Sequence, residues 1–150
     1  MPERIKGFIR EKKEDRPVLA ICYDFDKTLS PENMQAQGYI QDVYGPDEGS
    51  FWEESNELSF ANDMDTNLAY MYKMKEYARG KMVFNRKTLE DYGSKVRLFP
   101  GVESWFERIR AYGREQGVIV EHYIISSGLK EMIASAFTIR RAGTRQRYMI

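Results

Sequence analysis

Two aspartates one residue apart, Asp24 and Asp26, follow directly after the apolar run of residues 18–23. Side chains alternate along an extended chain, so these two carboxyl groups are expected to share one face. Like charges held that close repel each other, and their burial needs a cation or a shared proton to offset its cost. With the hydroxyl of Thr28, the pair could bind Mg²⁺ and provide a nucleophile and an acid–base group. A polar loop where a strand emerges into water is the simpler interpretation of two isolated acids.

Two apolar segments are predicted to be the strands that position these residues. The run VLAICY at 18–23 lies between Pro17 and the acids, and its lack of charge is typical of a parallel strand buried on both faces. The run VIVEHYII at 118–125 predicts a second strand, which ends at Ser126 and Ser127. Open parallel sheets bind ligands at the carboxyl ends of their strands, so both strand ends are candidate site positions.

Helical periodicity accounts for most of the remaining chain. Apolar residues recur at helical spacing from Val102 to Tyr112, and this pattern predicts a helix that ends before Gly117. Further helices are expected at 65–79, within 51–60, from 129 to 136 and in the charged leader at 3–16. No comparable apolar strand occurs between residues 30 and 95, and the methionine and aromatic side chains of this stretch favour a small core of its own.

The order of these features resembles the haloacid dehalogenase (HAD) superfamily. An apolar strand followed by Asp24-x-Asp26-x-Thr28-Leu29 is similar to the first motif of that family, and an apolar strand ending in Ser126 is similar to the second. The segment Phe99-Pro100-Gly101-Val102 with its helix resembles the stretch that leads into the second motif. The Asp-Lys-Thr sequence looks most like the phosphoserine-phosphatase-like branch.

The resemblance implies an α/β fold with a Rossmann-like core and an incomplete parallel sheet. Ser126 follows Asp24 by about 100 residues, whereas a βαβ unit takes only about 30. The difference predicts a helical cap at residues 30–96, inserted between the first two strands of a core formed by residues 1–29 and 97–150. In the superfamily such a cap controls access to the active site.

The resemblance also implies a role for each motif residue in a Mg²⁺-dependent phosphomonoester hydrolase. Asp24 would attack phosphorus to give an aspartyl-phosphate, and Asp26 would protonate the leaving oxygen and then activate water. Thr28 would position the loop that carries Asp26, and Ser126 would donate a hydrogen bond to a phosphoryl oxygen. Mg²⁺ would bridge the Asp24 carboxylate, the backbone carbonyl of Asp26 and the phosphate of a small phosphorylated substrate.

The sequence departs from the family pattern after the second strand. A cationic residue for the phosphate and a later acidic pair for the metal are expected, but no Asp or Glu follows Glu131. Lys130 is the nearest candidate for the cationic role, with a solvent-facing helix position as the alternative, and Asp63 and Asp65 could approach a metal from the insertion. Ser127 is expected to be the N-cap of the following helix.

The segment after residue 136 lacks the next apolar strand and contains four arginines and no acid, which predicts a truncated chain with weak or no activity. A non-catalytic HAD remnant that acts by binding, or a HAD protein with another phosphoryl-transfer activity, are the alternatives to a phosphatase.

Composition limits the class of protein further. The chain has 150 residues, 23 Lys and Arg against 23 Asp and Glu, and 42% hydrophobic residues. This balance is atypical of a disordered chain and gives no general reason to expect nucleic acid as partner. No apolar run reaches the roughly 18 residues of a membrane span. The single cysteine, Cys22, favours a reducing compartment such as the cytoplasm, and it is expected to be buried and inert within its strand. Oligomeric state is not predicted.

Overall fold

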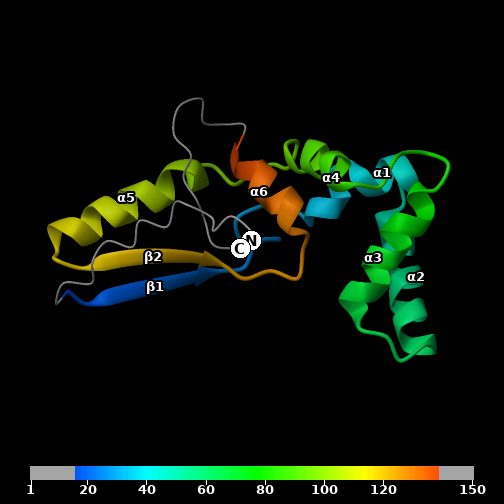
Figure 1. The fold of residues 1–150 in the computed structure, drawn as a ribbon, viewed down its shortest axis with the longest axis horizontal. Coiled ribbons are helices and arrows are strands. Elements are labelled where there is room, and N and C mark those ends of the chain that lie inside the picture. Colours follow the sequence, from blue (N-terminus) through cyan, green and yellow to red (C-terminus); the bar gives the residue numbers. More distant parts are fainter. Residues whose placement is uncertain (1–15, 139–150) are drawn as a thin grey trace, which may run out of the picture.

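The computed structural model describes residues 16–138 of the chain, which form a mixed α/β arrangement (Figure 1). A strand pair with one helix lies at one end, a group of helices lies at the other, and α4 and α6 lie between them. In chain order, the elements are β1 (Val18–Tyr23), the 3-10 helix η1 (Met34–Ala36), α1 (Tyr39–Val43), α2 (Glu48–Ala61), α3 (Thr66–Ala78), α4 (Arg86–Gly93), α5 (Val102–Glu115), β2 (Ile119–Ile124) and α6 (Lys130–Thr138). The helix expected at 3–16 and the basic segment after 138 lie outside the described residues.

The strands β1 and β2 pair in parallel, as the sequence predicted. Their register runs from Val18 opposite Ile119 to Tyr23 opposite Ile124. The backbone N–H of Ile125 donates to the carbonyl of Tyr23 at 2.8 Å, which extends the pairing one residue beyond β2. Both strands therefore end at the same edge, and the two segments with chemically active residues leave the sheet side by side.

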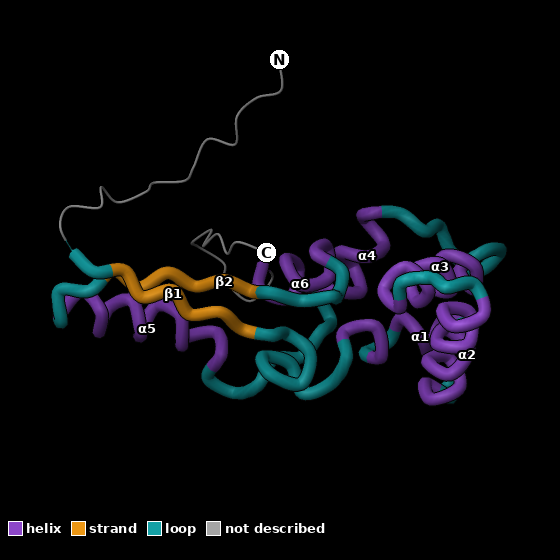
Figure 2. Tube along the Cα trace, turned by 90° about the horizontal axis from the view of Figure 1, so that it is seen from below, coloured by secondary structure: helices purple, strands orange, loops and turns teal. Residues whose placement is uncertain are grey.

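Helix α5 covers one face of the strand pair (Figure 2). Alternate residues of β2, including Val120 and His122, are buried toward it, as a period of two requires. Helix and strand approach closely at Gly113, because a Cβ there would overlap the Val120 side chain.

The opposite face of the strand pair has no covering helix among residues 16–138. Val18 is 38% exposed, Leu19 is 51% exposed, and Cys22 is exposed as well. The prediction that 18–23 is buried on both faces, and that Cys22 is buried within it, is therefore wrong for this part of the chain. The apolar run correctly predicts a parallel strand. Its burial on both faces would need a covering helix on each face, and residues 16–138 supply one on a single face.

His122 is a structural residue. It is 5% exposed, and its Nε2–H donates to the carbonyl of Phe106 at 3.1 Å. The hydroxyl of Tyr23 donates to Nδ1 at 3.0 Å, so both ring nitrogens are engaged. Burial lowers the pKa of His122, and the ring remains neutral where it packs against Phe106.

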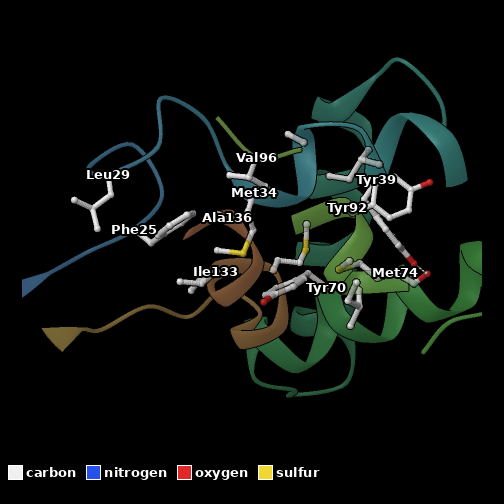
Figure 3. Packing of buried hydrophobic residues seen from close by; sticks show 14 of the residues in the cluster. Phe25, Leu29, Met34, Tyr39, Tyr70, Met74, Tyr92, Val96, Ile133 and Ala136 are labelled. Carbon is white, nitrogen blue, oxygen red and sulfur yellow. Dashed lines mark hydrogen bonds between the residues drawn. The ribbon is translucent and has the colours of Figure 1, made fainter. Parts of the chain in front are cut away.

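The main hydrophobic core lies beyond the strand ends rather than beneath the sheet. Figure 3 shows Phe25 and Leu29 on one side of this core and Tyr39 and Tyr92 on the other, with Met34 between them. Residues of α6, such as Ile133, belong to the same cluster. The methionine and aromatic side chains of the insertion thus do not form a separate core. Helices α4 and α6 pack together and join the helices of the insertion to the strand pair.

The contact between α4 and α6 depends on a small residue. A Cβ added at Gly93 would lie 2.5 Å from both the Cα and the carbonyl oxygen of Met132. Only glycine allows the two backbones to approach this closely.

Within residues 16–138, no helix combines the length and apolar character that crossing a bilayer requires.

Candidate active site

A tight turn follows β1 and carries the first candidate motif. The carbonyl of Phe25 accepts from the backbone N–H groups of Thr28, Leu29 and Ser30 at 3.2, 2.9 and 3.0 Å. Lys27 has a φ of 61°, in the left-handed region that few non-glycine residues adopt. The turn buries Phe25 and Leu29 in the core and leaves Lys27 and Thr28 exposed, so the apolar residues of the motif anchor the loop.

The two aspartates of the motif stand in different environments. Asp24 is exposed, and its Oδ1 accepts from the backbone N–H of Phe25 at 2.7 Å. Asp26 is half-buried, and its Oδ1 accepts from the backbone N–H of Met34 at 2.8 Å. Burial raises the pKa of Asp26 to about 6, the negative charge of Asp24 acts in the same direction, and the Met34 hydrogen bond opposes them. Asp26 therefore holds a proton at a pH where an exposed carboxyl group has released it.

The loop after β2 carries the second candidate motif and lies against the first. Ser126 is half-buried, and its Oγ accepts from the backbone N–H of Gly128 at 3.0 Å. Met34, whose N–H holds Asp26, reaches this loop with its side chain: the N–H of Leu129 points at its sulfur at 3.3 Å. A Cβ at Gly128 would overlap the end of the Met34 side chain, which would then have to shift, so the loop and Met34 are closely packed. Met34 thus fixes both motif loops relative to each other.

A cavity of about 230 Å³ opens where these loops face α2 and α3. The motif loops contribute Asp26, Ser127 and Gly128, and the segment before α1 contributes Asn33 and Gln35. Two groups of side chains complete the lining: Trp52, Ser55 and Asn56 on α2, and Thr66, Asn67 and Tyr70 on α3. The segment expected to be a cap therefore supplies most of the wall of a cavity that contains Asp26.

A direct hydrogen bond connects α3 to the second motif loop. The hydroxyl of Tyr70 donates to the carbonyl of Ser127 at 2.7 Å. Burial raises the pKa of Tyr70 to about 12, so this donor keeps its proton at neutral pH. Ser127 is exposed and two residues separate it from Lys130, where α6 begins, so the prediction that it is the helix N-cap is wrong.

The other predicted site residues lie outside the cavity wall. Asp24, Thr28 and Ser126 are close in sequence to residues that line the cavity, but they do not line it themselves. Lys130 is exposed at the first residue of α6. Asp65 serves as the N-cap of α3, where its carboxylate accepts from the N–H groups of Asn67 and Leu68.

Asp24 and Asp26 offer a donor set that fits Mg²⁺. Oxygen ligands suit this ion, which commonly binds through one or two carboxylates together with substrate phosphate oxygens. Within residues 16–138, no group of three or more His, Cys, Asp and Glu side chains could hold a metal. A magnesium site here would therefore use the Asp24 carboxylate, the Asp26 backbone carbonyl and oxygen atoms of the substrate.

Several lining residues were not predicted from the sequence. Gln35, Asn56 and Asn67 lie on separate elements, and no local pattern marks them as neighbours. Trp52 packs within the insertion against Phe51, with ring centroids 5.2 Å apart, and it also lines the cavity.

Comparison with known proteins gives one informative similarity. The chain is 29% identical over 131 residues to a protein of Borreliella burgdorferi that is described only as "Uncharacterized protein". The match covers 80% of this chain and 45% of that relative, so the chain spans about half the length of the curated protein it matches. No family model and no solved structure matches the chain.

Proposed function

We propose that the chain is a Mg²⁺-dependent phosphomonoester hydrolase of the HAD type. In this proposal, β1, α5 and β2 belong to a Rossmann-like core, and residues 30–96 are a cap that covers the substrate. The observation that supports it most is the position of Asp24 and Asp26 at the carboxyl end of β1, next to the loop of Ser126, with Asp26 in the wall of the cavity under α2 and α3. The substrate would be a small phosphate ester.

The environments of the two aspartates suit two different steps. Asp24, exposed at the strand end, attacks phosphorus through a carboxylate oxygen, and the bond from phosphorus to the ester oxygen breaks. Asp26 donates its proton to that departing oxygen, so the product leaves as an alcohol. Asp26, now ionised, takes a proton from water as the water oxygen attacks phosphorus, and inorganic phosphate leaves Asp24. A pKa of about 6 allows one side chain to serve as acid and then as base.

Ser126 and the loops around it bind and orient the phosphoryl group. The Ser126 oxygen already accepts from Gly128, so its hydroxyl proton is directed elsewhere and can be donated to a phosphoryl oxygen. Thr28 is proposed to position the turn that carries Asp26, and Lys130 is proposed to add positive charge from the start of α6. When bound to the Asp24 carboxylate and the Asp26 carbonyl, Mg²⁺ would supply the positive charge that offsets repulsion between carboxylate and phosphate.

Hydrolysis of 4-nitrophenyl phosphate by the 150-residue chain, with and without Mg²⁺, tests the proposal. Asp24→Asn should lower the rate at least about 1000-fold because the nucleophile is lost, and Asp26→Asn should lower it about 100- to 10,000-fold. Asp91→Asn is the matched control: Asp91 is exposed on α4 and pairs with Lys87, so its loss should leave the rate unchanged. Equal rates for the chain and Asp24→Asn would contradict the proposal.

A second candidate is phosphate-ester binding without turnover. It is favoured by the lack of a third acidic ligand near the pair within the described part of the chain. Beryllofluoride, which mimics a phosphoryl group on a carboxylate, separates the two candidates when ¹⁹F NMR follows its binding in the presence of Mg²⁺. If the parent chain traps beryllofluoride, Asp24→Asn abolishes the trapping, and the parent chain does not hydrolyse esters, then the chain is a binding protein. Neither trapping nor hydrolysis would contradict both candidates.

A further inference from the structure

The wall of the cavity is almost free of charge. Among the lining residues that the structure describes, Asp26 is the one with an ionised form near neutral pH, because the pKa of Tyr70 is raised to about 12. The described lining contains no Lys, Arg or Glu, although 31% of the whole chain is charged. From this we infer, on the basis of the proposed function, that the alcohol part of the substrate is small, uncharged and rich in hydroxyl groups, as in a polyol or monosaccharide phosphate.

The side chains opposite Asp26 are suited to hydroxyl groups. Asn56 and Asn67 each offer an amide with both donors and an acceptor, and Thr66 adds a hydroxyl. A hydroxyl group is also both donor and acceptor, so it can pair with such side chains in either direction. Neutral partners that donate and accept at several points therefore select a neutral ligand that does the same.

Gln35 adds a second, independent indication of a polar ligand. It is 2% exposed and lines the cavity, and its Oε1 has no hydrogen-bond partner within residues 16–138. A buried acceptor without a partner costs free energy, and a donor from a bound molecule would remove that cost. The Gln35 amide would therefore gain from an O–H or N–H donor, such as a polyol supplies, if its side chain turned Oε1 toward the cavity.

Trp52 contributes apolar surface rather than a donor. Its indole N–H donates to Glu48 Oε1 at 2.8 Å, and its ring packs against Tyr70 at a centroid distance of 5.7 Å. The ring therefore offers carbon atoms to the cavity. A carbohydrate presents both C–H groups and hydroxyl groups, so it matches this combination of an aromatic surface and amides.

The size of the cavity limits the ligand. At about 230 Å³ it is smaller than the roughly 300–1,000 Å³ of sites for drug-sized molecules. A six-carbon sugar or a shorter polyol has a suitable size.

A charged alcohol such as phosphoserine fits this wall poorly. Among the described lining residues, its carboxylate would meet no cation, and its ammonium group would find Asp26 as the only acidic partner. Burial of an unpaired charge is strongly unfavourable. The cavity therefore favours glucose 6-phosphate over phosphoserine, although both are phosphate monoesters of primary alcohols.

The test compares these two esters on the 150-residue chain with Mg²⁺ present. The chain has two tryptophans, so Trp105→Phe leaves Trp52 as the fluorescent reporter of the cavity. Glucose 6-phosphate should bind at least about tenfold more tightly than phosphoserine, and phosphate release should show the same preference in kcat/KM. Equal affinity for the two esters, tighter binding of phosphoserine, or binding of neither would overturn the inference.

A variant of the cavity wall makes the test specific. Asn67→Leu replaces the amide with an apolar side chain of similar size. It should weaken the binding of glucose 6-phosphate about fivefold, the typical effect of one neutral hydrogen bond. The substitution should leave the binding of 4-nitrophenyl phosphate unchanged, because the 4-nitrophenyl group carries no hydroxyl groups besides the esterified one. Gln116→Leu, at the exposed end of α5, is the control and should change neither substrate. Equal loss with both substrates would contradict the assigned role of Asn67.

Failure of this inference is distinguishable from failure of the proposed function. Beryllofluoride trapping on Asp24 reports the phosphoryl site alone, whereas the preference between the two esters reports the cavity wall. Trapping without a preference for glucose 6-phosphate would reject only the inference. A preference for glucose 6-phosphate without trapping would reject the aspartyl-phosphate mechanism and retain the cavity as a polyol site.

Discussion

The raised pKa of Asp26 predicts that Asp26→Asn stabilises the fold at neutral pH while it destroys activity. Asparagine has almost the same shape as aspartate. Its Oδ1 can still accept from the Met34 N–H, which lies 2.8 Å from Asp26 Oδ1 in the parent chain. The substitution removes the cost of holding a charge in a half-buried position next to Asp24. A site that trades stability for chemistry is expected to behave in this way.

The magnitude follows from the difference in pKa between the folded and unfolded states. Burial raises the pKa of Asp26 from 3.8 to about 6, and each unit corresponds to about 1.36 kcal/mol. The upper limit is therefore about 3 kcal/mol. Because Asp26 is partly in contact with solvent, which screens its interactions, we expect about 1–2 kcal/mol.

The sign of the pH dependence is set by which state binds more protons. Between pH 3.8 and about 6 the folded chain keeps the Asp26 proton that the unfolded chain has released. The stability that protonated Asp26 confers is thus fully present below the unfolded pKa and is lost as pH rises through the folded one. Asp26→Asn should not show this loss.

Urea denaturation in EDTA, followed by circular dichroism at about pH 4.5 and about pH 7.5, measures the effect as a difference in unfolding free energy. The variant should be about 1–2 kcal/mol more stable than the parent chain at the higher pH, and the advantage should shrink at the lower one. Both chains contain His122, so its own pH dependence cancels in the difference. An equal or lower stability of Asp26→Asn at about pH 7.5 would refute the reasoning.

Two further predictions concern the contacts that hold the site together. Gly93→Ala should cost about 3 kcal/mol in denaturation experiments because its Cβ would collide with the Met132 backbone, whereas Gly49→Ala in α2, with more room, should cost less than about 0.5 kcal/mol. A small loss for Gly93→Ala would show that α4 and α6 can move apart. Tyr70→Phe removes the bond to the Ser127 carbonyl and should lower stability by about 1 kcal/mol. It should also raise KM for glucose 6-phosphate, and an unchanged KM would mean that α3 is held in place without this bond.

Local patterns in the sequence predicted the elements that carry the motifs. The apolar runs ending near Tyr23 and Ile124 are strands, and the helical spacing from Val102 predicted α5, because each of these signals repeats within a few residues. Helix α4 was missed because Leu89 and Tyr92 are its only buried large apolar side chains, and eight residues with two such positions show no clear period.

The sequence by itself determined that an aspartate pair and a serine stand at the ends of two parallel strands, since period and spacing are properties of neighbouring residues. Only the tertiary structure decided that Met34 holds the two motif loops together, that one face of β1 is uncovered among residues 16–138, and that α2 and α3 close a neutral cavity over Asp26. These features depend on contacts between residues far apart in the chain, such as Tyr70 and Ser127, and a local pattern carries no record of such partners.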